Sequence, residues 1–131
     1  MEFVFYLIEG MGVIEDIVVI TKTDKSHYSV GEEAKISITL SNKGAKSVEL
    51  LFASAQRYDI VIKEGENRVW YWSSDKMFAM TIGTVVLKPG KKKTYKATWK
   101  IETEIPGEYD VIGTIKSQPS LSDKRTIKII T

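Results

Sequence analysis

The side chains arranged most like a catalytic pair are Ser26 and His27, the one histidine of the chain. A serine becomes a nucleophile when a general base lies within hydrogen-bonding reach of its hydroxyl. Neighbouring side chains on an extended chain point to opposite sides, so we expect His27 to be a loop residue without a catalytic role. The chain has no cysteine, which excludes thiol catalysis, disulfides and thiolate metal sites.

The carboxylates do not form a recognisable site either. The pairs Glu32 with Glu33 and Glu102 with Glu104 lie in turn-like stretches, where carboxylates are usually solvated. No spacing makes several carboxylates converge on a metal ion, and no glycine-rich loop is present to hold a phosphate. We therefore expect no catalytic residue, no metal and no cofactor, and we predict that the protein is not an enzyme.

The overall charge is nearly balanced, with 19 lysines and arginines against 17 acidic residues and a net charge of +2. This balance gives little attraction for nucleic acid or an anionic membrane. The stretch KPGKKK (88–93) precedes Tyr95 and Trp99, a combination that resembles a stacking platform for bases. Both aromatic residues fall on the apolar side of their strand, so we predict neither a nucleic-acid nor a membrane partner.

The N-terminus contains the apolar run FVFYLI (3–8), flanked by Glu2 and Glu9. A membrane span needs about 20 apolar residues, and a secretory signal needs a positive leading segment and a small-residue cleavage site. We therefore expect a cytoplasmic protein in which residues 2–8 form a strand. That strand either lies at an edge of the fold or pairs with a second chain in a homodimer.

Apolar and polar residues alternate along most of the chain. Such a period of two indicates strands with one face on a core and the other in water. Turn signals rich in Gly, Pro, Asn and Asp separate the runs. The expected strands are 13–22, 34–41, 47–53, 57–63, 68–73, 84–87, 93–101, 108–117 and 124–131. The pattern predicts an all-β fold, an immunoglobulin-like antiparallel β-sandwich forming one domain over residues 1–131.

The strands 57–63 and 68–73 read as a hairpin around EGEN (64–67). A four-residue loop sets Lys63 opposite Arg68. In this register the core face carries Tyr58, Ile60, Ile62, Val69 and Tyr71. The second face carries Arg57, Asp59, Val61, Trp70 and Trp72. Both faces would then be apolar, and an uncovered pair of tryptophans would be a binding site or an aggregation hazard.

The segment that follows the hairpin, SDKMFAMTIG (74–83), offers a cover for the second face. We expect Met77, Phe78, Met80 and Ile82 to fold back over the two tryptophans. Arg57 is expected to stack on Trp72 and to bond Asp59 or a carbonyl. The alternative is that the tryptophans form an aromatic patch that binds a partner.

The same stretches resemble the intracellular proteinase inhibitor (BsuPI) family over residues 28–117. The resemblance lies in a Gln-Arg-Tyr-Asp strand, a Trp-x-Trp-Ser strand, a Met-Phe step, a Leu-x-Pro-Gly turn and a Pro-Gly-x-Tyr strand. Here these are Gln56, Arg57, Tyr58 and Asp59; Trp70, Trp72 and Ser73; Met77 and Phe78; Leu87, Pro89 and Gly90; Pro106, Gly107 and Tyr109. Most of these residues are of types that build a scaffold.

The resemblance implies an immunoglobulin-like sandwich and a non-enzymatic protein that inhibits a protease. We expect it to act through exposed loops at one end of the sandwich. The resemblance implies a serine protease, whereas other immunoglobulin-like inhibitors act on cysteine proteases, so both classes stay open. The other hypothesis is a structural or interaction module that binds another protein without inhibiting it. Fold similarity alone does not decide between these functions.

The first candidate for a protease-facing loop is the connection 117–123, which links two predicted strands. Its contact residues would be Gln118, Pro119, Ser120, Leu121 and Ser122. Leu121 is the one large apolar side chain there, and it would either enter a specificity pocket or tuck against the sandwich edge. An up-and-down chain path puts the turns 42–46, 64–67, 88–92 and 118–123 at one end. Secondary contacts would come from Asn42, Lys43 and Gly44.

The rival loop lies in the 74–83 segment, which the same path places at the opposite end together with 24–33, 54–56 and 102–107. Its contact residues would be Lys76, Met77 and Phe78. If these side chains cover the tryptophans, they are not available to an enzyme cleft.

Overall fold

The computed structural model describes residues 2–9, 12–102 and 105–130, with side chains from residue 16 on. Strands dominate this part of the chain, and one short 3-10 helix, η1, follows β7. The elements are β1 (Glu2–Glu9), β2 (Gly12–Thr23), β3 (His27–Ser29), β4 (Glu33–Asn42), β5 (Val48–Phe52), β6 (Tyr58–Glu64), β7 (Asn67–Tyr71), η1 (Trp72–Asp75), β8 (Gly83–Leu87), β9 (Lys92–Lys100), β10 (Gly107–Ile115) and β11 (Leu121–Ile130).

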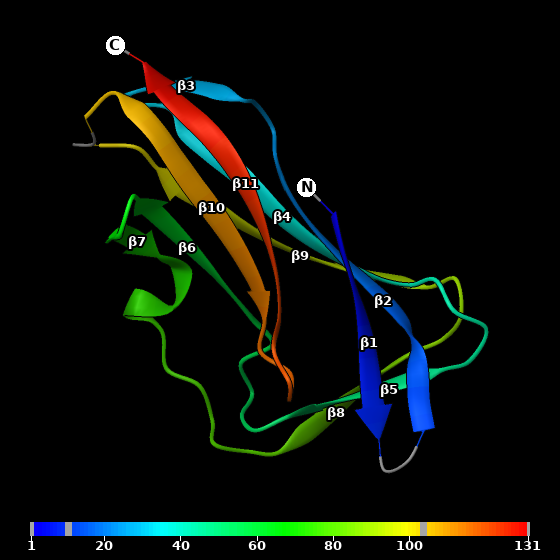
Figure 1. Cartoon of the computed structure of the whole chain (residues 1–131). Helices are drawn as coiled ribbons and strands as arrows, with labels where there is room; N and C mark the ends of the chain where they lie inside the picture. The colour runs from blue at the N-terminus through cyan, green and yellow to red at the C-terminus, as the bar shows by residue number, and fades with distance from the viewer. Residues whose placement is uncertain (1, 10–11, 103–104, 131) are drawn as a thin grey trace.

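Two sheets pack face to face, as Figure 1 shows. Sheet A has the strand order β1-β2-β4-β9, and sheet B has the order β3-β11-β10-β6-β7. The pairs are antiparallel except for β3, which runs parallel to β11. A two-stranded ribbon of β5 and β8 lies at the lower end of Figure 1 and joins sheet B through a bridge between Phe52 and Ser117. The predicted all-β sandwich is confirmed.

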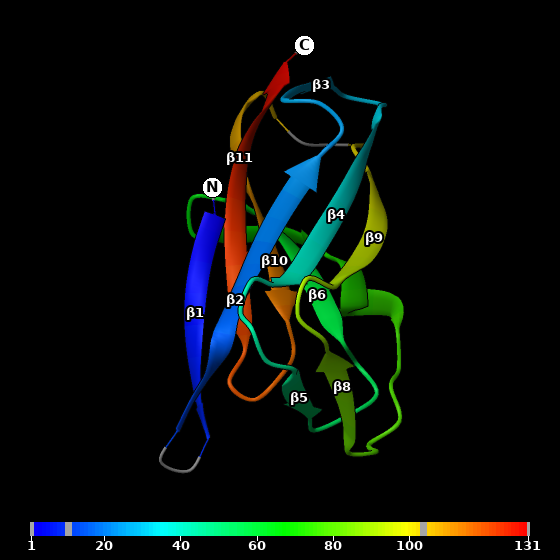
Figure 2. The same ribbon diagram turned by 90° about the vertical axis from the view of Figure 1, so that its right-hand side faces the viewer.

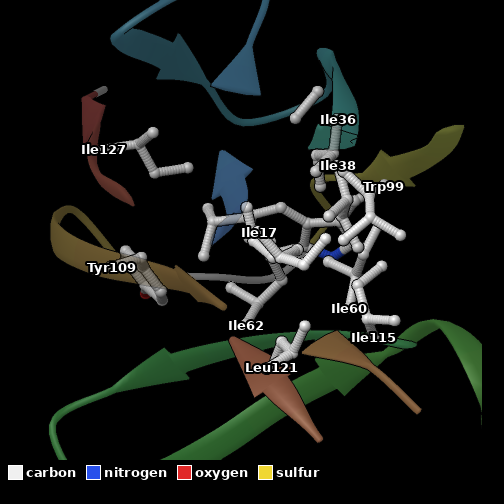
Figure 3. Close-up of a cluster of buried hydrophobic side chains, with 14 of the residues drawn as sticks. Ile17, Ile36, Ile38, Ile60, Ile62, Trp99, Tyr109, Ile115, Leu121 and Ile127 are labelled. Carbon is white, nitrogen blue, oxygen red and sulfur yellow. The ribbon is translucent and has the colours of Figure 1, made fainter. Parts of the chain in front are cut away.

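The core lies between the sheets and is built from the inward residues of each alternating strand (Figure 3). Ile36 and Ile38 of β4 meet Ile60 and Ile62 of β6, and Trp99 of β9 lies beside them. All five are at most 1% exposed. Removing this apolar surface from water stabilises the fold by roughly 25 cal/mol per Å².

A hydrogen bond at the start of β10 ties this strand to the loop before it. The Tyr109 hydroxyl donates to the carbonyl oxygen of Ile105 at 2.6 Å. Tyrosine corners of this kind recur in Greek-key sandwiches, where the ring fills the core and the hydroxyl fixes the turn. The Pro-Gly-x-Tyr motif seen in the sequence therefore has a structural role here.

The β6–β7 hairpin departs from the predicted register. Lys63 does pair with Arg68, but Ile62 then pairs with Trp70, because a β-bulge makes Val69 an extra residue. After the bulge, each residue of β7 therefore faces the side of the sheet opposite to the predicted one. Trp70 consequently packs against the core, Val69 is 38% exposed, and Tyr71 lies opposite Val61. The prediction that isoleucines and tryptophans occupy opposite faces is wrong.

The grouping of turns by end is also partly wrong. The 64–67 turn lies beside Gly107, whose added Cβ would stand 3.9 Å from the Glu64 Oε2 atom. The residues after β10 lie at the other end, because the Lys116 amide donates to the Arg57 carbonyl and the Gln118 amide to the Leu51 carbonyl. The connections 54–56, 74–83 and 116–120 therefore share one end.

Two short stretches near the N-terminus complete the fold. β1 is the edge strand of sheet A, paired antiparallel with β2 (Figure 2), so the expected strand at 2–8 is confirmed as an edge of the same chain. His27 lies in β3 rather than in a loop. Its Nδ1 atom is 2.9 Å from the Ser26 hydroxyl, so these two side chains do meet, contrary to the expectation.

Candidate functional site

The most exposed apolar side chains of the described residues lie between η1 and β8, in residues 76–82. Met77 is 99% exposed, Met80 86% and Ile82 74%. The prediction that these three cover the tryptophans is wrong. A soluble protein usually buries such side chains, and a contiguous apolar group on the surface commonly marks an interaction site. We call residues 76–82 the exposed segment.

An aromatic column supports the exposed segment from below. Phe78 is the one large apolar residue of the segment that turns inward, with its ring 5.9 Å from that of Trp72. The Trp72 ring stacks on Tyr58 at 4.1 Å, and Tyr58 stacks on Tyr95 of β9 at 4.7 Å. The Lys76 ammonium lies 4.5 Å from the centre of the Trp72 ring. Phe78 and Lys76 therefore fix the first half of the segment.

Two of the tyrosines in this column titrate unusually. Burial raises the pKa of the Tyr95 hydroxyl above its ordinary value. Burial is also the main cause that raises the pKa of Tyr58, and the Asp59 carboxylate adds to it. The hydroxyl oxygen of Tyr95 is buried without a hydrogen-bond partner in the described part of the chain, whereas Tyr58 donates to the Lys96 carbonyl at 3.0 Å.

The entrance to the segment is held by Asp59. Its carboxylate accepts hydrogen bonds from the Ser73 hydroxyl at 2.6 Å and from the Ser73 amide at 3.1 Å. These bonds attach η1 to β6, fourteen residues earlier in the chain. After η1 the backbone becomes extended, with φ −123° and ψ 151° at Lys76.

Arg57 lies beside Gly83, the residue at which the segment reaches β8. Its guanidinium lies 4.6 Å from the centre of the Phe52 ring and donates to the Ser54 carbonyl at 2.8 Å. The expected stacking of Arg57 on Trp72 is therefore wrong, because the guanidinium lies over Phe52 instead. The expected bond to a carbonyl is confirmed. A Cβ at Gly83 would stand 2.8 Å from the guanidinium, so a side chain at Gly83 would displace Arg57. In the middle of the segment, the Ala79 carbonyl accepts a hydrogen bond from the Ala55 amide at 2.9 Å.

The apolar surface continues onto the outer face of the β5–β8 ribbon. Leu51 is 47% exposed and Val86 is 54% exposed. Leu51 pairs with Thr84, two residues before Val86 in β8, and Ile82 immediately precedes this strand. Leu51 and Val86 are therefore the exposed apolar residues of this face, which also carries Glu49 and Thr84.

The connection 117–123, the first candidate for a protease-facing loop, does not expose its leucine. Leu121 is 2% exposed and is the first residue of β11, where it pairs with Ile115, so the prediction of an exposed anchor is wrong. Ser122 is half-buried and lies in the strand. Gln118, Pro119 and Ser120 remain exposed at the tip, and the Gln118–Pro119 peptide bond is cis. The loop presents polar atoms and no large apolar side chain.

The loop at Asn42, Lys43 and Gly44, predicted to make secondary contacts, mainly stabilises the fold. Asn42 is 1% exposed, and its amide donates to the carbonyls of Lys46 and Leu87. Its side-chain oxygen accepts from the Gly44 amide at 2.9 Å. Asn42 therefore fixes the bend between β4 and β5, and only Lys43 is exposed among the three predicted residues.

A metal site and a Ser-His pair are two other kinds of site that side chains of these types can form. The described residues contain no group of three His, Cys, Asp or Glu side chains that could hold a metal ion. Ser26 and His27 are both exposed, and no described carboxylate is hydrogen-bonded to the imidazole to orient it as in a catalytic triad. Within these ranges, no helix is long and apolar enough to cross a membrane.

The chain matches a known protein family over most of its length. The model of the intracellular proteinase inhibitor (BsuPI) family matches residues 21–120. The chain belongs to this family. Members of a proteinase inhibitor family bind proteinases and are generally not enzymes themselves. Arg57, Tyr58, Asp59, Trp70 and Trp72 all lie within the match, and the structure gives each of them a packing or hydrogen-bonding role.

Solved structures resemble the fold at low sequence identity. Spo0M, the sporulation control protein of Bacillus subtilis, aligns with a TM-score of 0.60 and 17% identity over 86% of this chain. The chain spans about half of Spo0M, 49% of its length. A CARDB domain from Pyrococcus furiosus, solved with di-metal ions, aligns with a TM-score of 0.54 and 15% identity over 88% of both chains. At these identities the likeness shows the fold alone.

A β-glucosidase from Erythrobacter marinus gives a third comparison. It aligns with a TM-score of 0.53 and 11% identity over 92% of this chain, but over only 16% of its own length. The sandwich therefore matches a small part of that enzyme. No curated protein sequence matches the chain.

Proposed function

We propose that the chain inhibits a cytoplasmic proteinase by placing its exposed segment, residues 76–82, in the cleft of the enzyme. Family membership supplies the class of partner, and the 99% exposure of Met77 is the observation that carries the choice of segment. A segment that imitates a substrate must be exposed, extended and fixed at both ends. In residues 76–82, Met77 is exposed and the backbone at Lys76 is extended. The bonds from Ser73 to Asp59 fix the start of the segment, and the pairing of Gly83 with Phe52 fixes its end.

The chemistry of the segment favours a proteinase with an apolar specificity pocket. Methionine is unbranched and adaptable, so Met77 would fill a deep apolar pocket without a charged partner. Met80 and Ile82 would contact flanking subsites. A serine proteinase is the enzyme class that the family resemblance favours.

Neighbouring residues extend the proposed contact. Phe52 pairs with Gly83 on one side and with Ser117 on the other, so β5 separates the exposed segment from the loop at Gln118. Strands are spaced about 4.8 Å apart, which puts the two connections about 10 Å from each other. We expect the polar tip of 118–120 to touch the rim of the same enzyme.

A panel of serine and cysteine proteinases tests the proposal. Against an inhibited enzyme, Met77→Asp is expected to raise the inhibition constant at least tenfold, about 1.4 kcal/mol. The matched control is Ile105→Asp, which changes a 63% exposed apolar residue near the opposite end. Equal inhibition by Met77→Asp and the parent would exclude the segment as the inhibitory element.

The second hypothesis, an interaction module without inhibitory activity, is favoured by the outer face of the β5–β8 ribbon. Leu51 and Val86 lie outside the exposed segment and would not enter a cleft, but they suit a flat protein surface. If no member of the panel is inhibited and a partner is lost on Leu51→Asp, this hypothesis replaces the first.

A further inference from the structure

The outer face of sheet A carries a hollow of about 330 Å³ where β2, β4 and β9 run side by side (Figure 2). Two rows of residues line it, in strand order. They are Lys22, Ser37 and Lys96 in the first row, and Asp24, Lys35 and Thr98 in the second. The row between them points the other way, with Ile36 only 1% exposed, so its backbone forms the floor.

The three lysines are placed to reach one point. Lys22 and Lys96 both flank Ser37, and Lys35 lies two residues away on the central strand. Strand spacing puts their Cα atoms about 8 to 10 Å apart. The flexible four-carbon stems then allow all three ammonium groups to meet above Ser37.

No described carboxylate forms an ion pair with these lysines. The ion pairs among residues 16–102 and 105–130 are Lys25 with Glu32 and Lys76 with Asp75, on other parts of the surface. No described hydrogen bond involves the ammonium groups of Lys22, Lys35 or Lys96, either. Lys35 is a diagonal neighbour of both Lys22 and Lys96, so an anion bound between the three would reduce the repulsion among their charges.

One carboxylate, Asp24, lies at the rim and opposes an anion. Its Oδ1 atom accepts hydrogen bonds from the Tyr28 hydroxyl at 2.6 Å and from the Lys35 amide at 3.0 Å. The Tyr28 bond is the main cause that lowers the pKa of Asp24, so this group is charged at neutral pH. The hollow still has three positive groups against one negative group.

The composition of the hollow fits phosphate better than protein or bases. Interfaces with proteins are usually anchored by aromatic residues or arginine, and neither type lines this hollow. The nearby aromatic residues Tyr95 and Trp99 turn inward and contact the core, so no ring is available to stack a base. Lysine ammonium and Ser or Thr hydroxyl groups are common donors to phosphate oxygens.

We propose that this hollow binds a compact polyphosphate, a small molecule with two or more phosphate groups close together. Its volume lies at the lower end of the range for small-molecule sites, about 300 to 1,000 Å³, and exceeds the size of one phosphate. Lys22, Lys35 and Lys96 neutralise the charge, and Ser37 and Thr98 donate hydrogen bonds. The site lies on sheet A, away from the exposed segment, and does not depend on the inhibitory function.

Isothermal titration calorimetry of the full chain with tripolyphosphate tests the site. The variant K22Q/K35Q/K96Q is expected to weaken binding at least tenfold. A control of equal net charge, K46Q/K124Q/K128Q, changes three exposed lysines outside the hollow and should bind like the parent. All six residues are exposed, and circular dichroism verifies that both variants fold.

Three further ligands define the chemistry of the site. Inorganic phosphate should bind at least tenfold more weakly than tripolyphosphate, because it engages fewer lysines. Equal weakening by the two triple variants would mean diffuse attraction to a basic chain and would overturn the proposal. Tighter binding of duplex DNA or of anionic phospholipid vesicles, lost with the same three lysines, would overturn the compact ligand in favour of an extended one.

Discussion

Two connections at the same end of the sandwich differ in whether the large apolar residues beside them are buried. Residues 116–120 are short, and the strand that follows begins with Leu121, which is 2% exposed. Residues 76–82 are longer and leave Met77 99% exposed. In sequence both regions offer large apolar residues to a partner, Leu121 in the first and Met77, Phe78, Met80 and Ile82 in the second.

The difference comes from what lies next to each connection. The Gln118 amide is bonded to the Leu51 carbonyl and the Ser117 hydroxyl to the Pro119 carbonyl, so the chain turns tightly and Leu121 enters the core at once. The exposed segment instead uses its inward position for Phe78, and Trp72 already occupies the space beneath. One aromatic anchor thus leaves the neighbouring methionines in water.

The largest effect is expected from Leu121→Ala. Removing a fully buried leucine side chain should lower the free energy of unfolding by about 2–5 kcal/mol, measured by urea denaturation. Met77→Ala is the matched control and should change stability by less than about 0.5 kcal/mol, as for other surface substitutions. Equal midpoints for Leu121→Ala and the parent would mean that the leucine is not in the core.

An intermediate effect is expected from Trp72→Ala, which removes the ring under Phe78. Because Trp72 is half-buried, the loss should be about 2 kcal/mol, below the 3–5 kcal/mol typical of fully buried aromatic residues. The exposed segment should also become easier to cleave by limited proteolysis. Trp70→Ala is the control: it contacts Trp99 instead of Phe78, so it should lower stability without faster cleavage at 76–82.

The smallest effect is expected from Tyr95→Phe. Because burial raises the pKa of this hydroxyl, its contribution to stability is complete below pH 10, its ordinary pKa, and is lost as the pH rises above it. Removing the unpaired hydroxyl should change stability at pH 7 by less than about 1 kcal/mol. Urea midpoints measured from pH 7 to 11 should fall less steeply than in the parent. An identical decline would show that Tyr95 does not titrate in the column.

Most of the fold could be predicted from the period of two. Alternation located the strands of both sheets, because a half-buried strand needs it and turn residues separate the runs. β3 was missed because three residues are too few to show a period, and Tyr28 alone carries its buried face. The bulge was missed because Val69 and Trp70 are both apolar, so either can be assigned to the core.

The site was harder to predict because polar residues concealed a strand. Asp123 and Arg125 share the inward face of β11 with Leu121 and Ile127, and this made residues 117–123 look like a loop. Asp123 is tolerated there because its carboxylate accepts the Thr21 amide at 2.6 Å. Such a partner, about a hundred residues away in the chain, leaves no local signal.

The extra residue in β7 also bears on how the hairpin can change in length. Pairing Val69 with Ile62 in a regular ladder would turn Trp70 from the core to the surface, and the Trp72 ring would leave Tyr58 with it. Deleting Val69 would instead keep Trp70 opposite Ile62. Deleting a residue from the 64–67 turn would shift the pairing without a compensating bulge. The direction in which the exposed segment leaves the sandwich then depends on Val69 staying outside the ladder.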